Sequence, residues 1–129
     1  KDKLLFTGDT LFSLGCGRIF EGTYEQMFNS LNLLKTFPKD TKIYCGHEYT
    51  LKNSEFCLKN DEENLKLKEK IILIKEKLNY GVPTIPSTIK DELECNIFLR
   101  SDNELIQKNL NTSNELDTFS KLRDLKDIY

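Results

Sequence analysis

FTGDTLF, residues 6–12, and YCGHEYT, residues 44–50, are the two stretches that decide the predicted fold and the candidate site. In each stretch, a short apolar run that is typical of a strand ends at a glycine, and a polar loop follows. Asp9 stands in the first loop, and His47, the single histidine of the chain, stands in the second. Both side chains therefore follow predicted strand ends, which is where ligand sites gather in α/β sheets.

Residues 1–50 are predicted to fold as a strand, a loop, a helix and a second strand. The apolar run Leu4–Phe6 predicts a buried strand, and the glycine-rich stretch 9–22 has no helical period and predicts a long loop. A capping-box spacing followed by apolar residues at helical intervals predicts a helix over 23–36. The second short strand is expected at Lys42–Cys45.

Residues 51–129 are predicted to be mainly helical. Leu51–Lys59 and Glu115–Ile128 both have helical character, and a third helix between them is expected to be capped by Asp61. The apolar stripe of this middle helix is Leu67, Ile71, Ile74 and Leu78. Such stripes indicate helices that cover a shared core.

The connections between these helices are also readable from the residues. Val82–Ile89 contains two prolines and predicts an extended connector, and Ser87 or Thr88 is expected to cap a short helix after it. The polar, Asn-rich stretch Ser101–Ser113 predicts a mobile loop.

Composition indicates one folded domain. The chain has 129 residues, of which 38% are hydrophobic and 31% are charged. Its net charge is −2 with both signs interspersed, so nucleic acid is not an expected partner. No apolar run approaches the roughly 18 residues that span a bilayer, and no signal peptide opens the sequence, so no membrane partner is expected. The four cysteines form no Cys-x-x-Cys pair and are expected to be free thiols in a reducing compartment, the cytoplasm.

Asp9 and His47 each permit a structural interpretation beside a functional one. An aspartate after Thr-Gly often bonds its own backbone in a turn, and a single histidine is more often a structural residue than a ligand. Carboxylate oxygen and imidazole nitrogen are also good donors to first-row metal ions. A catalytic zinc needs three protein ligands, so these two residues cannot hold a metal ion alone.

The motifs in combination resemble a known family. FTGDTLF, GCGR (residues 15–18), EGT (residues 21–23) and YCGHEYT resemble the second half of glyoxalase II, the hydroxyacylglutathione hydrolases of the metallo-β-lactamase superfamily. VPTIPSTI (residues 82–89) and NIFLR (residues 96–100) resemble the C-terminal helical domain of the same family. The resemblance implies an α+β fold, with residues 1–50 as the second half of a metallo-β-lactamase αβ/βα sandwich and residues 51–129 as a helical substrate-binding domain.

The resemblance also implies two divalent metal ions in the whole protein, zinc by preference, with iron or manganese as alternatives. Asp9 matches the aspartate that bridges both ions, and His47 matches a histidine ligand of the second ion. The other ligands of the family come from an upstream His-x-His-x-Asp-His run and one more histidine, which this chain lacks because it has one histidine in total. The implied reaction is attack of a metal-bound hydroxide on S-D-lactoylglutathione, which yields D-lactate and glutathione. This chain by itself is expected to be inactive and to bind metal weakly or not at all.

Four further residues match positions that hold the glutathione thioester. Arg18 matches a basic residue, often lysine, that meets the glutathione backbone, and Tyr49 matches a tyrosine that contacts glutathione. Arg123 and Lys126 match a basic pair that holds the glycine carboxylate, and their i, i+3 spacing puts both on one helix face. Phe20 departs from the pattern, because some members of the family have tyrosine there.

Two alternatives stay open from the sequence. The chain could belong to a persulfide dioxygenase of the same superfamily, although the run GHEY at residues 46–49 and the long helical region argue against it. It could also be a helical interaction module in which Asp9 and His47 are relics. Strands that lack their partners are expected to leave exposed edges, through which copies of the chain would associate with one another.

Overall fold

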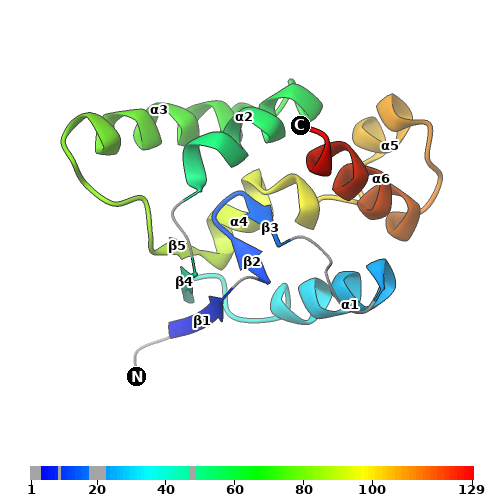
Figure 1. Cartoon of the computed structure of the whole chain (residues 1–129), viewed down its shortest axis with the longest axis horizontal. Helices are drawn as coiled ribbons and strands as arrows, with labels where there is room; N and C mark the ends of the chain where they lie inside the picture. The colour runs from blue at the N-terminus through cyan, green and yellow to red at the C-terminus, as the bar shows by residue number, and fades with distance from the viewer. Residues whose placement is uncertain (1–3, 9, 18–22, 47–48) are drawn as a thin grey trace.

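The computed structural model describes residues 4–8, 10–17, 23–46 and 49–129 as a small α+β fold that is mostly helical (Figure 1). The strands are β1 (Leu4–Gly8), β2 (Leu11–Phe12), β3 (Gly15–Cys16), β4 (Lys42–Cys45) and β5 (Ser87–Thr88). The helices are α1 (Tyr24–Leu34), α2 (Thr50–Asn60), α3 (Leu65–Asn79), α4 (Ile89–Cys95), the 3-10 helix η1 (Ile97–Leu99), α5 (Glu104–Leu110) and α6 (Glu115–Asp127). None of these helices is both long and apolar enough to cross a bilayer, as far as the described residues go. The predicted α+β class is thus confirmed.

A three-stranded sheet with the order β1-β4-β5 lies at one side of the fold (Figure 1). β1 runs parallel to β4, with Leu5 opposite Ile43 and Gly8 opposite Cys45, and β5 runs antiparallel to β4. Parallel neighbours need a long crossover, and here the crossover contains the β2–β3 hairpin and α1. The carboxyl ends of β1 and β4 therefore lie side by side.

One hydrophobic core joins the hairpin to the helices. The hairpin contributes Leu11 and Leu14, which are both fully buried. The rings of Phe56 in α2 and Phe98 in η1 stack with their centroids 5.8 Å apart, and Phe119 in α6 meets Phe98 edge-on at 6.1 Å. Because these residues come from distant parts of the sequence, the hairpin and the helices depend on one another for burial.

Several predicted boundary signals are confirmed. Thr23 and Gln26 form the capping box of α1, with Gln26 N donating to Thr23 Oγ1 at 3.1 Å and Thr23 N donating to the Gln26 side chain at 2.9 Å. Thr88 caps α4 by accepting a hydrogen bond from Asp91 N at 3.1 Å. The second strand has the predicted bounds, Lys42–Cys45. These elements carry their signals in a few neighbouring residues, so local sequence is sufficient to find them.

The cap of α3 differs from the prediction. Asn64, and not Asp61, caps this helix, because the Asn64 side chain accepts a hydrogen bond from Leu67 N at 3.1 Å. Asp61 instead follows the end of α2 and is buried, where its carboxylate accepts hydrogen bonds from Arg100 Nε and Asn64 Nδ2, each at 2.9 Å. Asp61, which the sequence indicated as a local helix cap, thus forms a long-range ion pair with Arg100 instead.

Two predicted loops contain regular structure. The stretch 9–22 includes the β2–β3 hairpin, whose strands have two residues each. The prediction of a mobile loop over 101–113 is wrong, because α5 occupies its middle. Asn103 caps α5, while Ile106 and Leu110 anchor it in the core. Tertiary burial of these two side chains stabilises a helix that is too short and polar to be evident from its own sequence.

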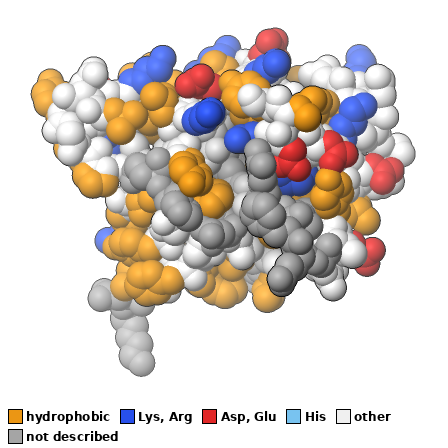
Figure 2. Space-filling model, viewed as in Figure 1, with side chains coloured by type: hydrophobic (Ala, Val, Ile, Leu, Met, Phe, Trp, Pro, Cys, Tyr) orange, Lys and Arg blue, Asp and Glu red, His pale blue; other side chains and the backbone are white. Residues whose placement is uncertain are grey.

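The first strand is less buried than predicted. Leu4 and Phe6 are 45% and 75% exposed, and the Phe6 ring lies against Tyr44 of β4 with centroids 5.4 Å apart. Figure 2 shows hydrophobic side chains gathered over this corner of the molecule, at the lower left. The described residues cover one face of the sheet and leave an apolar face of β1 open.

Candidate functional site

The ends of β1 and β4 bring together the chain segments that lead to Asp9 and His47. Gly46 N donates a hydrogen bond of 2.7 Å to Gly8 O, directly before these two residues in the sequence. Neighbouring strands lie about 4.8 Å apart, so the two segments leave the sheet next to each other. Asp9 and His47 themselves lie outside the described residues, as do Arg18 and Phe20.

A metal centre is not complete within the described residues. Among them, no three His, Cys, Asp or Glu side chains lie close enough together to hold an ion. A carboxylate and an imidazole that follow neighbouring strand ends suit a divalent cation by their donor chemistry. Asp9 and His47 are nevertheless fewer than the three ligands that a catalytic zinc needs, so a complete site requires further donors.

Tyr49 stands directly before α2, at its N-cap position, and its side chain is half exposed. The ring meets Phe12 of β2 edge-on, with centroids 5.3 Å apart. It lines a surface pocket together with Leu51, Lys52, Glu55 and Tyr129. The tyrosine is therefore accessible to a ligand and connects the hairpin to the end of α6.

Arg123 in α6 is buried, with 2% of its surface exposed. Nη1 donates to the carbonyl oxygens of Cys16 at 2.7 Å and Gly17 at 3.1 Å. Nε and Nη2 both contact Asp127 Oδ1, at 3.2 and 2.9 Å. Burial raises the pKa of the Cys16 thiol to about 11, although the nearby guanidinium acts in the opposite direction. Arg123 thus holds the chain immediately before Arg18, and its assignment to a substrate carboxylate stays a prediction.

Lys126 lies about one turn after Arg123 in α6, beside the aromatic rings of Phe56 and Tyr129. Its Nζ is 5.9 Å from the ring centroids of both Phe56 and Tyr129. The Arg123 guanidinium carbon is 5.2 Å from the centroid of Phe98, which stacks on Phe56. The two cations therefore lie over one stacked pair of aromatic rings, where cations are favourably placed.

The residues that sequence reasoning missed are polar side chains that contact the hairpin backbone. Asn53 of α2 donates to Ser13 O at 3.2 Å, and Glu92 of α4 accepts from Leu14 N at 2.8 Å. A signal for Glu92 exists in the sequence, because it follows Ile89 by three residues and so falls on the apolar face of its helix. An acid on a buried face needs a partner, and the partner here is the hairpin.

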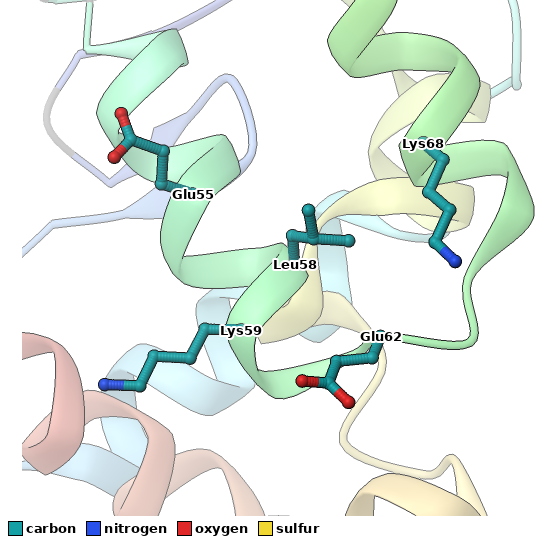
Figure 3. A pocket seen from close by; sticks show the side chains of 5 residues that line it. All are labelled: Glu55, Leu58, Lys59, Glu62 and Lys68. Carbon is teal, nitrogen blue, oxygen red and sulfur yellow. The ribbon is translucent and has the colours of Figure 1, made fainter.

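A second pocket lies between α2 and the start of α3 (Figure 3). It is lined by Glu55, Leu58, Lys59, Glu62 and Lys68. Figure 3 shows the two lysine side chains pointing away from each other, and two acids balance their charge. Neither Tyr49, Arg123 nor Lys126 lines it. This pocket is accordingly not the candidate site.

Similarity to known proteins extends over nearly all of the chain. A family model described as "Hydroxyacylglutathione hydrolase C-terminus" matches residues 48–129. A hydroxyacylglutathione hydrolase of Pelagibacter ubique is 62% identical over 128 residues, which cover 99% of this chain and 48% of the relative. A cytoplasmic hydroxyacylglutathione hydrolase of Arabidopsis thaliana is 48% identical over 124 residues, which cover 95% of this chain and 48% of the relative.

A third relative, a hydroxyacylglutathione hydrolase of Rhodopseudomonas palustris, is 41% identical over 97% of the chain. The chain spans about half the length of the curated relatives that it matches. The family resemblance that the motifs predicted is confirmed by the family model and by these relatives. The chain belongs to the hydroxyacylglutathione hydrolase family, and it carries the C-terminal region of that family.

Proposed function

We propose that the protein containing this chain hydrolyses S-D-lactoylglutathione, a hydroxyacylglutathione thioester, to D-lactate and glutathione. The observation that carries the proposal is the family match, which extends over nearly all of the chain at 62% identity to one hydrolase. The arrangement of β1 and β4 supports it, because the segments leading to Asp9 and His47 leave the sheet side by side.

We propose that Asp9 and His47 are ligands of two divalent metal ions, with zinc as the expected metal and iron or manganese as alternatives. Ions at such a site lower the pKa of a water molecule and polarise a carbonyl group. Asp9 matches the aspartate that the family resemblance assigns to both ions, and a carboxylate would suit that role because it has two donor oxygens. The remaining donors are expected from the half of the relatives' length that this chain does not span.

We propose that a region matching this other half of the relatives' length completes an αβ/βα metallo-β-lactamase sandwich, with residues 1–50 as its second half and 51–129 as the helical substrate-binding domain. The exposed side chains of Leu4 and Phe6 support this proposal, because apolar sheet faces are normally covered. Without that cover, copies of the chain are expected to associate through this face and through the edge of β1. Reduced cysteines and the name of the Arabidopsis relative support a cytoplasmic location.

The glutathione moiety is proposed to contact Arg18, Tyr49, Arg123 and Lys126. The accessible ring of Tyr49 and the half-buried Lys126 both border Tyr129, which supports a common binding surface. Arg123 Nη1 also donates to Cys16 O and Gly17 O, so this side chain holds the segment that leads to Arg18.

The proposal is tested by assaying the whole protein for zinc-dependent hydrolysis of S-D-lactoylglutathione. The readout is the loss of absorbance of the thioester. Asp9→Asn and His47→Ala should each lower kcat/KM by at least the roughly 100-fold that loss of an outer-shell partner can cause, and they should also lower the bound zinc. A wild-type protein that binds zinc without hydrolysing the thioester would refute the proposed activity.

The substrate contacts are tested by matched pairs of variants. Lys126→Met should raise KM about 10-fold or more, as expected for a bond to a charged group, whereas Lys121→Met on the same helix should leave KM unchanged. Tyr49→Phe should raise KM by about 2- to 10-fold, with the exposed and remote Tyr80→Phe as its control. Equal effects of a variant and its control would contradict the assigned contact.

A further inference from the structure

The backbone of the β2–β3 hairpin is held by side chains from the helical region. Its turn, Ser13–Leu14, is buried, so its polar groups need partners other than water. The donors to its carbonyl oxygens are Asn53 Nδ2 to Ser13 O at 3.2 Å, Cys57 Sγ to Leu14 O at 3.1 Å, Asn96 Nδ2 to Gly15 O at 3.0 Å, and Arg123 Nη1 to Cys16 O at 2.7 Å. Two helices, α2 and α6, and the residue after α4 therefore determine the path of this short segment.

Glu92 is central to this arrangement. Its side chain is fully buried, and Oε1 accepts hydrogen bonds from Leu14 N at 2.8 Å and from Asn96 Nδ2 at 2.9 Å. Oε2 accepts a third bond from Ser87 Oγ of β5 at 2.6 Å. Burial of a carboxyl group is unfavourable unless its oxygens are satisfied, and here the satisfied oxygens join the hairpin to the sheet and to α4. An apolar side chain at this position could fill the volume but could not bind Leu14 N.

The hairpin does not define its own conformation. Each of its strands has two residues, which is too short for a hairpin to be stable by itself. Leu14 has a φ of +62°, in the left-handed region that residues with a side chain rarely adopt. Such a conformation persists only where the surroundings impose it, and the bond from Leu14 N to Glu92 is one of the contacts that do so.

We propose that Glu92, together with Asn96, is a positioning residue for the thioester hydrolysis proposed above. The hairpin is the stretch of chain between Asp9 and Arg18, the assigned metal ligand and the assigned glutathione contact. By binding Leu14 N and Gly15 O, the pair sets the path of the chain between these two functional residues. The helical region thus supports the metal end of the site as well as binding substrate.

The variants follow from the geometry of the Glu92 contacts. In Glu92→Gln, the amide oxygen can still accept from Leu14 N and Asn96, and the amide nitrogen can donate to Ser87 Oγ. This variant should keep kcat/KM within about threefold of wild type, because the bonds are weakened and not lost. Glu92→Leu removes the acceptor and should lower kcat/KM by about 10- to 100-fold, the range seen when outer-shell partners of metal ligands are lost.

A control separates positioning from a general loss of stability. Thr118→Val removes a buried hydroxyl that bonds Asn114 O at 2.7 Å and has no bond to the hairpin among the described contacts. All variants are assayed in the whole protein at a temperature where circular dichroism shows them folded, and zinc affinity is measured by competition with a chelator. Zinc affinity should fall about 10-fold in Glu92→Leu and stay unchanged in Glu92→Gln and Thr118→Val. If Glu92→Leu does not fold, Asn96→Ser replaces it, with the same losses expected.

The outcomes distinguish this inference from the proposed function. An active wild type whose folded Glu92→Leu variant matches Thr118→Val in kcat/KM and zinc affinity would overturn the positioning role and leave the activity standing. An inactive wild type would instead refute the activity. The expected result is that kcat/KM and zinc affinity fall in Glu92→Leu and stay near the wild-type values in Glu92→Gln.

Discussion

Gly15 lies where the hairpin comes close to a helix. A Cβ atom at this position would lie 2.6 Å from Asn53 Nδ2 and 2.9 Å from Asn53 Cγ. Asn53 is 5% exposed, and its side chain donates a hydrogen bond to Ser13 O at 3.2 Å. The side chain therefore has little room to move, and a displacement would break this hydrogen bond. Gly15→Ala should therefore destabilise the fold through this one contact.

Two effects determine how much Gly15→Ala should lower the free energy of unfolding. Insertion of a methyl group into a well-packed interior costs about 1–3 kcal/mol. Displacement of Asn53 from Ser13 O costs a further 0.5–1.5 kcal/mol or so, as for a typical hydrogen bond. Gly15→Ala should accordingly lower the free energy of unfolding by about 1.5–4.5 kcal/mol in urea titrations.

A double-mutant cycle with Asn53→Ala tests whether the contact is the cause. Truncation of Asn53 makes room for the new methyl group, so the double variant should be more stable than the sum of the single effects by about 1 kcal/mol or more. Gly81→Ala is the control, because Gly81 has a φ of +68° and no described atom would lie within 4 Å of a Cβ added there. Its effect should add to that of Asn53→Ala. Effects of Gly15→Ala and Asn53→Ala that also add within about 0.5 kcal/mol would refute the steric argument.

Two further predictions concern titratable groups. Burial raises the pKa of Glu92 above 4.5, so the folded state keeps this proton to a higher pH than the unfolded state. The stability that Glu92 contributes should therefore fall as the pH rises above 4.5. In urea titrations, the free energy of unfolding of wild type should decrease relative to that of Glu92→Gln over that range. A difference between the two proteins that stays constant with pH would contradict the shift. Native-state labelling with a thiol reagent should modify the partly exposed Cys45 first, since Cys16, Cys57 and Cys95 have thiols whose pKa burial raises, and rapid labelling of all four would contradict the packing.

The elements that local sequence could predict are those whose signals are close together in the chain. The capping box of Thr23 and Gln26 marks the start of α1, and the apolar run before Gly46 marks β4. α5 has a local cap, Asn103, but its stability comes from Ile106 and Leu110, which enter a core built by distant residues. Short polar helices of this kind form only when tertiary packing compensates for their weak propensity.

The candidate site divides in the same way. A glycine and a strand end point to Asp9 and His47 in the sequence. That the segments leading to them leave the sheet side by side depends on the parallel pairing of β1 with β4 across a long connection. Helical spacing places Arg123 and Lys126 near each other on α6, and both lie over the stacked rings of Phe56 and Phe98. It cannot indicate that the guanidinium faces the carbonyl oxygens of Cys16 and Gly17, because those lie more than one hundred residues earlier in the chain. Spacing reports which face a side chain occupies, and only the fold determines what that face meets.

The dependence of the hairpin on distant helices has a consequence for how function can be lost. Two-residue strands with a left-handed Leu14 have almost no conformational preference of their own, so their geometry follows the side chains of Asn53, Glu92 and Asn96. A buried polar network is rigid when every member is satisfied and loses that rigidity when one member is removed. Substitutions of Asn53, Glu92 and Asn96, none of which is an assigned metal ligand, are therefore expected to alter metal affinity before they unfold the helices. A scan in which activity followed only global stability would contradict that coupling.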